Sequence, residues 1–175
     1  MSRLDLALSR IQRWDERVCL RFNRALRYRV LLGTFRAVSS LGDGVFWYAL
    51  MLGLLLSSAH AAPAVAHMAL VGLACSVLYK LLKRGTSRPR PYQVHSAIAA
   101  GASPLDRFSF PSGHTLHAVA FTLVALAHYP ALATLLVPFT LLVALSRVVL
   151  GLHYPSDVLA GALIGAALAG GSLLL

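Results

Sequence analysis

Five apolar stretches dominate the chain from residue 45 onward, and they constrain its fold more than any other feature. A transmembrane helix needs about 20 mainly apolar residues, so the shorter stretches must borrow flanking residues to cross a bilayer. Of the 175 residues, 58% are hydrophobic and 13% are charged, whereas soluble domains carry roughly 25% charged residues. We therefore expect an all-α, polytopic membrane helix bundle with about five transmembrane helices. The stretches are Val45–Ala59, Ala62–Leu82, Thr115–Ala127, Ala131–Leu145 and Val158–Leu175.

Local motifs inside these stretches agree with a membrane bundle. Trp47 and Tyr48 stand where interfacial aromatic anchors are expected. The segment 128–130, His-Tyr-Pro, predicts a tight hairpin between two spans. Gly161 and Gly165 are followed by Ala169 at the same four-residue spacing. Small residues at this spacing favour close helix packing, although the pattern is common and not specific.

The first 44 residues form a different, basic segment. Residues 2–26 predict an amphipathic helix, and a second short helix is expected over Val30–Leu41, ending at Gly42-Asp43-Gly44. Two interpretations of the first helix stay open: it lies in the membrane interface, or it packs on the protein's own surface. We thus divide the chain into an interfacial segment, 1–44, and a transmembrane domain, 45–175. The predicted apolar face of the first helix carries Leu4, Leu8, Ile11, Val18 and Phe22.

The 16 Lys and Arg and the six Asp and Glu residues are distributed unevenly, with a formal net charge of +10. Residues 57–63, residues 128–130 and the C-terminus contain none of them. With five spans, these uncharged turns share one membrane face and all formal charges lie on the other. Basic clusters beside apolar spans attract anionic lipid headgroups, whereas nucleic-acid readers carry theirs on a soluble face. We therefore expect a membrane and lipid partner and no nucleic acid.

Two processing and redox signals are missing from the sequence. The N-terminal residues contain no continuous apolar run like that of a cleaved signal peptide. Cys19 and Cys75 match no metal or redox spacing and are expected to be apolar fillers.

Three polar clusters on the charged face carry the candidate chemistry: residues 83–91, 111–114 and 146–157. Charged groups beside membrane spans are functional candidates by default. Lys83, Arg90 and Arg147 supply positive charge, and arginine binds phosphate oxygens in a bidentate manner. Ser112 and Gly113 open a predicted helix, where free backbone amides bind anions. These clusters predict a phosphate site.

Histidines in the same clusters can supply the reaction. His114 stands at the predicted helix start and can donate a proton to a leaving oxygen. His153 and Asp157 are four residues apart, so the carboxylate can hold the imidazole in one tautomer. A neutral imidazole held in this way can attack phosphorus and form a phosphohistidine. His117 follows His114 by three residues, but no Glu accompanies them as in a zinc protease helix, and we expect no metal and no cofactor.

These residues resemble the three-part signature of the type 2 phosphatidic acid phosphatase superfamily. The parts are Lys83-x6-Arg90-Pro91, Pro111-Ser112-Gly113-His114 and Ser146-Arg147-x5-His153-x3-Asp157. The resemblance covers roughly residues 45–175 and leaves out the arginine-rich N-terminus.

The resemblance implies a helical fold shared with vanadium haloperoxidases and soluble bacterial acid phosphatases. By motif position it implies a nucleophile, His153, its orienting partner, Asp157, and a general acid, His114. It implies phosphate binding by Lys83, Arg90, Ser112, the Gly113 amide and Arg147, with no metal.

Other charged residues of the loop after residue 83 have no assigned role. Asp106 is expected to be a local cap or an ion-pair partner. Arg88 is expected either to bind a lipid headgroup or to be solvated, as are Arg84 and Arg107.

The predicted function is a phosphatase acting on a membrane lipid phosphate or diphosphate. Candidate substrates are phosphatidate, phosphatidylglycerophosphate and polyprenyl diphosphate, and the oligomeric state is open. The alternatives are a lipid transporter or scramblase that retains the phosphate pocket, and a vanadate-dependent peroxidase. We expect a multi-pass protein of a bacterial inner (cytoplasmic) membrane. Nine arginines precede the first span, so the positive-inside rule favours a cytoplasmic site, whereas the resemblance points to the periplasm.

Overall fold

The structure is a computed structural model that describes residues 3–104 and 106–175, and within them all regular structure is helical. Met1, Ser2 and Leu105 lie outside the described residues, as do the side chains of Arg3, Leu4 and Ala59. The longer helices are α1 (Arg3–Asn23), α2 (Arg29–Ser40), α3 (Phe46–Ser57), α4 (Ala62–Arg84), α6 (Gly113–His128), α7 (Ala133–Val149) and α8 (Pro155–Ser172). The short elements are η1 (Arg24–Arg27), η2 (Leu41–Val45), η3 (Ala59–Ala61), α5 (Pro91–Val94) and η4 (Pro130–Leu132).

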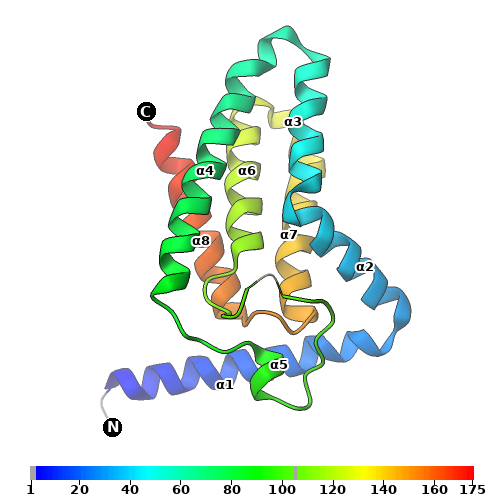
Figure 1. Cartoon of the computed structure of the whole chain (residues 1–175), viewed down its shortest axis with the longest axis vertical. Helices are drawn as coiled ribbons and strands as arrows, with labels where there is room; N and C mark the ends of the chain where they lie inside the picture. Colours follow the sequence, from blue (N-terminus) through cyan, green and yellow to red (C-terminus); the bar gives the residue numbers. More distant parts are fainter. Residues whose placement is uncertain (1–2, 105) are drawn as a thin grey trace.

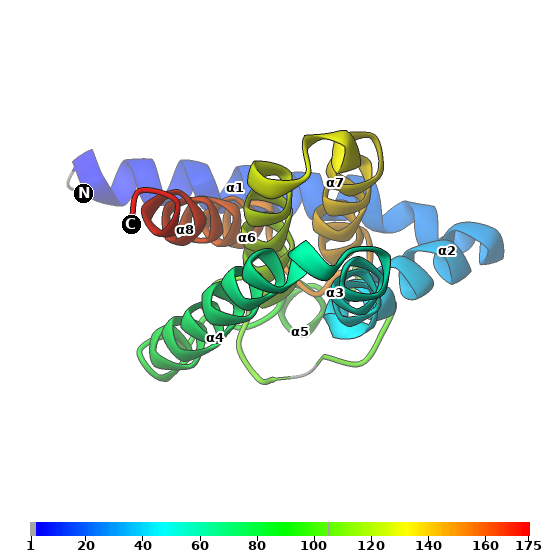
Figure 2. The ribbon, with the colours of Figure 1, turned by 90° about the horizontal axis from the view of Figure 1, so that it is seen from above.

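Helix α6 is the centre of the bundle. It packs against α4, α7 and α8, and Figure 2 shows it among these three helices. Its side chains Leu116, Ala118 and Val124 are fully buried. Helix α1 lies across one end of the bundle, and α2 leads from it toward α3 (Figure 1). The all-α prediction is therefore confirmed for the described residues.

Three helical segments of the described chain are long and apolar enough to cross a membrane: Arg29–Ser57, Ala62–Arg84 and Pro130–Val149. Helices α6 and α8 run beside them (Figure 1). The first segment consists of two helices joined across a kink: α2 ends at Ser40, and Gly44 within η2 has non-helical backbone angles. The predicted turn at Gly42-Asp43-Gly44 is therefore confirmed, and the candidate span starts earlier than predicted because it includes α2. Gly44 has φ 133°, a value that suits glycine and that an L side chain rarely adopts.

The polar segments gather at one end of the bundle. Turns η3 and η4 lie at one end, and α1, the long loop after α4 and the loop before α8 lie at the other (Figure 1). All three polar clusters therefore meet at the same end, as the charge distribution predicted.

Close contact between α6 and α8 sets the geometry of this polar end. A Cβ atom on Gly161 would lie 2.5 Å from the carbonyl oxygen of Ser112, and one on Gly165 would collide with the carbonyl of Leu116. The predicted small-residue packing is confirmed. The contact also brings the two motifs together, since the Ser112 amide donates to the carbonyl of Asp157 at 3.1 Å.

Helix α1 buries three residues outside its predicted apolar face, and of that face Val18 is partly buried, packed against the cluster around Cys19. Asp15, Cys19 and Asn23 are buried, whereas Leu8 and Ile11 are exposed. The helix therefore packs on the protein and still presents apolar side chains outward, so the two interpretations of α1 do not exclude each other. The interfacial role of α1 and the division at residue 44 stay predictions.

Candidate active site

The imidazole of His153 lies in the loop between α7 and α8 and is almost completely buried. Its Nδ1 lies 2.6 Å from the carbonyl oxygen of Ser109. Since a carbonyl only accepts, the ring proton is on Nδ1 and Nε2 carries the lone pair. Arg90 Nη1 donates to Nε2 at 3.2 Å. Burial and the nearby Arg147 and Arg90 hold the pKa of His153 well below its ordinary value, so the ring stays neutral.

Asp157 contacts His153 less directly than the sequence predicted. Its Oδ2 is 3.9 Å from His153 Nδ1, beyond hydrogen-bond distance. This oxygen accepts from the backbone amide of Tyr154 at 2.8 Å, which caps the start of α8. His153 precedes that helix, so the two side chains are not on one helical face. The Ser109 carbonyl, and not Asp157, is therefore the hydrogen-bond partner of His153 Nδ1.

Two predicted phosphate-binding cations meet one carboxylate. Lys83 Nζ and Arg90 Nη2 donate to Asp106 Oδ1 at 2.9 and 2.8 Å. The Tyr79 hydroxyl donates to its other oxygen. Burial alone would raise the pKa of Asp106, but hydrogen bonds from Tyr79 and Lys83 hold it below the ordinary value. The predicted ion-pair role of Asp106 is confirmed.

Arg147, the third predicted cation, is buried beneath α2. It donates to the hydroxyl of Ser39. Its Nε is also buried, and within the described residues it has no hydrogen-bond partner. Buried donors in proteins are nearly always satisfied, so this N–H is suited to an oxygen of a bound anion.

The start of α6 supplies backbone donors. Ser112 is the N-cap residue and makes no side-chain capping bond, and its hydroxyl instead lies 3.0 Å from that of Thr115. The first amides of a helix have no partner within it and bind anions well. Gly113 is required here, because a Cβ atom would lie 2.7 Å from the ring of Tyr79.

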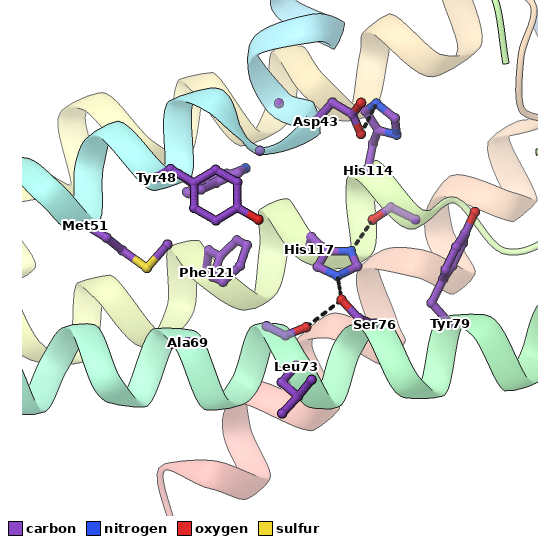
Figure 3. Close-up of a pocket in the computed structure, with 15 residues that line it drawn as sticks. Asp43, Tyr48, Met51, Ala69, Leu73, Ser76, Tyr79, His114, His117 and Phe121 are labelled. Atoms are coloured by element: carbon purple, nitrogen blue, oxygen red, sulfur yellow. Dashed lines mark hydrogen bonds and ion pairs between the residues drawn. The ribbon is translucent and has the colours of Figure 1, made fainter. Parts of the chain in front are cut away.

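His114 faces a cavity of about 430 Å³ between α3, α4 and α6. Figure 3 shows its Nε2 beside Asp43 Oδ1, at 3.4 Å. Beyond this polar end the cavity is lined by apolar side chains, including Met51, Leu73 and Phe121. The cavity therefore runs from Gly113 and His114 into the apolar interior, and its lining does not include His153 or the three predicted cations.

No metal site accompanies these histidines in the part of the chain that the structure describes. His117 is held by Ser76 at 3.1 Å and by the carbonyl of Gly113 at 2.9 Å (Figure 3). These contacts do not form a ligand set with His114.

Sequence reasoning missed Ser109 and Asp43 and misjudged Arg88. The Arg88 side chain is 28% exposed, but its terminal nitrogens are paired inside the protein, since they donate to Asp15 at 2.7 Å and to Asp157 at 2.6 Å. The sequence did contain a pattern that marks Asp15. It is an acidic residue on a basic helix, and Cys19 and Asn23 follow it at four-residue spacing, on the same helical face. No sequence signal marks the Ser109 carbonyl.

The family model described as the PAP2 superfamily matches residues 60–175. The chain belongs to the PAP2 superfamily. The match contains all three motifs and excludes α1, α2 and α3. The resemblance stated from the motifs is thereby confirmed.

Relatives and solved structures agree with this assignment. Over 87 residues the chain is 44% identical to the decaprenylphosphoryl-5-phosphoribose phosphatase of Mycobacterium tuberculosis, covering 49% of this chain and 46% of that protein. The chain spans about half the length of the curated relatives it matches. The crystal structure of Aquifex aeolicus LpxE has TM-score 0.76 at 28% identity, covering 89% of this chain and 93% of that one.

A second solved structure is the first transmembrane PAP2 type phosphatidylglycerolphosphate phosphatase from Bacillus subtilis. It has TM-score 0.75 at 26% identity, covering 93% of this chain and 84% of that one. Together with the three candidate spans, this likeness shows that the chain is an integral membrane protein with a polytopic helical fold.

Proposed function

We propose that the chain is a lipid phosphatase that hydrolyses a phosphomonoester or diphosphate headgroup through a phosphohistidine at His153. One observation carries the proposal: the buried imidazole is neutral, its proton is held by Ser109, and its Nε2 lone pair faces Arg90. A nucleophile in this state needs no base to activate it.

The phosphate is bound by cations and helix amides. Lys83, Arg90 and Arg147 surround the nucleophile, and the Gly113 amide and Ser112 add neutral donors. A phosphate oxygen satisfies the buried Arg147 Nε and competes with Asp106 for the other two cations. These fixed donors stabilise the charge that develops on the equatorial oxygens in the transition state.

The reaction proceeds in two steps. Nε2 of His153 attacks phosphorus, the bond from phosphorus to the leaving oxygen breaks, and His114 gives that oxygen a proton. The phosphoimidazole is positively charged while Nδ1 keeps its proton, and Asp157 opposes this charge. Water then attacks phosphorus, His114 takes back a proton, and inorganic phosphate leaves as Nε2 recovers its lone pair.

The cavity between α3, α4 and α6 suits the lipid tail of the substrate. Its apolar walls continue from the polar end at His114 and Asp43. The similar proteins are named for a decaprenylphosphoryl sugar phosphate and for phosphatidylglycerolphosphate. We therefore propose the class of membrane lipid phosphates, and a panel of phosphatidate, phosphatidylglycerophosphate and a polyprenyl diphosphate identifies the substrate.

The first prediction tests the nucleophile with purified His153→Ala. We expect phosphate release on the panel to fall by at least about 10³-fold, because the attacking atom is lost. His60→Ala, in turn η3 at the opposite end, is the matched control and keeps wild-type activity. Rapid denaturation in alkaline detergent, where the acid-labile P–N bond survives, traps labelled phosphate on the wild type and on His60→Ala but not on His153→Ala.

The same assay separates this mechanism from its rivals. Activity persists in EDTA, and orthovanadate inhibits by occupying the phosphate site. Wild-type turnover by His153→Ala would instead favour a transporter that uses the pocket for binding. Complete loss of activity in EDTA with recovery in Mg²⁺ would contradict a phosphate site built only from positively charged side chains and backbone amides.

We also propose that the site faces the cytoplasm, in the inner membrane of a bacterium. The arginines of α1 and α2 support this, because they lie outside the catalytic motifs and still follow the positive-inside rule.

A further inference from the structure

A carboxylate on α1 reaches the catalytic motif across the fold. Asp15 is fully buried. Its Oδ1 accepts from the amide of Ser156 at 2.9 Å, and its Oδ2 accepts from the hydroxyl of Ser156 at 2.5 Å. Oδ2 also accepts from Arg88 Nη2 at 2.7 Å. Asp15 is therefore bound both to the start of α8, just after His153, and to the long loop after α4.

Arg88 connects Asp15 to Asp157. Its second terminal nitrogen, Nη1, donates to Asp157 Oδ1 at 2.6 Å, and its guanidinium lies 4.1 Å from the ring centroid of Tyr154. One planar group thus bridges two buried carboxylates, which fixes the orientation of both. The bridge ends 3.9 Å from His153 Nδ1, at the other oxygen of Asp157.

The charges of this bridge do not cancel. Asp15 and Asp157 carry two negative charges and Arg88 carries one positive charge, so the buried cluster is negative overall. When His153 Nε2 bonds to phosphorus, the imidazole becomes positively charged beside this cluster. Burial weakens solvent screening, so a net negative cluster stabilises the charged intermediate.

We propose that Asp15 is a positioning residue for the phosphoryl transfer: it holds Arg88 in the bridge and keeps the cluster beside His153 negative. The inference rests on the proposed function of His153 as the nucleophile. It assigns a role in the reaction to α1, which lies outside the residues that match the family model.

Contacts other than those of Asp15 also dock α1, so we expect its charge to be testable separately. Asn23 Nδ2 donates to the carbonyls of Ala99 at 2.9 Å and Val149 at 3.0 Å, and Asn23 Oδ1 accepts from the Ala99 amide at 2.9 Å. The thiol of Cys19 lies 3.6 Å from the carbonyl of His153. These contacts hold the helix in place when Asp15 is changed.

The experiment compares Asp15→Asn with Glu16→Gln in the purified full chain. Both remove one negative charge from adjacent positions of α1, but Glu16 contacts His95 at 3.5 Å and not the bridge. We expect Asp15→Asn to lower kcat about tenfold with KM nearly unchanged, and Glu16→Gln to behave as wild type. Arg88→Lys keeps the charge but cannot bridge both carboxylates, and it gives the same selective loss of kcat.

Inhibitor binding provides a second measurement that needs no turnover. Orthovanadate bonded to Nε2 leaves the imidazole charged, so its binding weakens in Asp15→Asn. Inorganic phosphate binds without a bond to Nε2, so we expect Asp15→Asn to bind it with the same affinity as the wild type. A general loosening of the site would weaken both anions equally, and this result would overturn the inference.

A double-mutant cycle identifies the route of the effect. If Asp15 acts through Asp157, Asp15→Asn causes no further loss of kcat in an Asp157→Asn background. Independent, multiplicative losses, or wild-type kcat in Asp15→Asn, would overturn the inference while leaving the nucleophile intact. Failure of the proposed function looks different: the wild type itself releases no phosphate and binds no vanadate.

Discussion

At the scale of single residues, a backbone carbonyl determines the chemical state of His153. The Asp157 carboxylate does not bond to the His153 imidazole, because its oxygens accept from Arg88 and from the Tyr154 amide at the start of α8. The Ser109 carbonyl accepts the Nδ1 proton instead. Because a carbonyl does not titrate, the tautomer persists over a wide pH range.

The low pKa of His153 predicts a pH dependence of stability. An imidazole in an unfolded chain titrates near 6.5, as a rough reference value. Below that pH the unfolded chain binds a proton that folded His153 does not, so the free energy of unfolding falls by about 1.4 kcal/mol per pH unit. Above it this contribution is constant. Thermal unfolding between pH 5 and 7.5 measures the effect, and His153→Gln should show a shallower slope. Identical slopes would mean that folded His153 titrates normally.

At the scale of elements, the contact between α6 and α8 positions the phosphate site. Gly161 lets α8 approach the Ser112 carbonyl, and the Ser112 amide bonds to the carbonyl of Asp157. Two motifs far apart in sequence thus share one backbone junction. The packing of two helices here also sets the direction of the free amides at the start of α6.

Gly161→Ala tests this junction. The new methyl group must displace the start of α6, so we expect a loss of about 1–3 kcal/mol of stability together with weaker phosphate release. Gly170→Ala on the same helix is the control, because nothing lies within 4 Å of its Cβ position. Thermal unfolding and the release assay report the two effects. Equal behaviour of the two variants would show that α8 is free to move away from α6.

At the scale of the whole molecule, the charge asymmetry predicts orientation. The nine arginines of residues 1–36 lie at the active-site end, and turn η4 at the other end carries no formal charge. The positive-inside rule therefore places the N-terminus in the cytoplasm. With five spans, alkaline phosphatase fused to the C-terminus should be active and green fluorescent protein should be dark. The same reporters inserted at turn η4 should agree. Fluorescence at the C-terminus would overturn the orientation or the number of spans.

Local properties of the sequence determined the fold class and most of the candidate site. Apolar runs and helix spacing depend on neighbouring residues, so they predicted the helix bundle and the small-residue contact at Gly161. The three motifs predicted which cations and histidines meet, because each motif is short and lies at a helix end.

Only the tertiary structure decided which groups hold these residues in place. Ser109 meets His153 across 44 residues, and Asp15 meets Ser156 across 141. No spacing rule connects such pairs, because the folding of the loops and the docking of α1 bring them together. The same docking changed the expected buried face of α1: Asp15 and Asn23 are buried because the start of α8, the end of α7 and the loop after α4 satisfy their hydrogen bonds. The sequence by itself therefore determined the parts of the site, and the long-range contacts decided their orientation and charge.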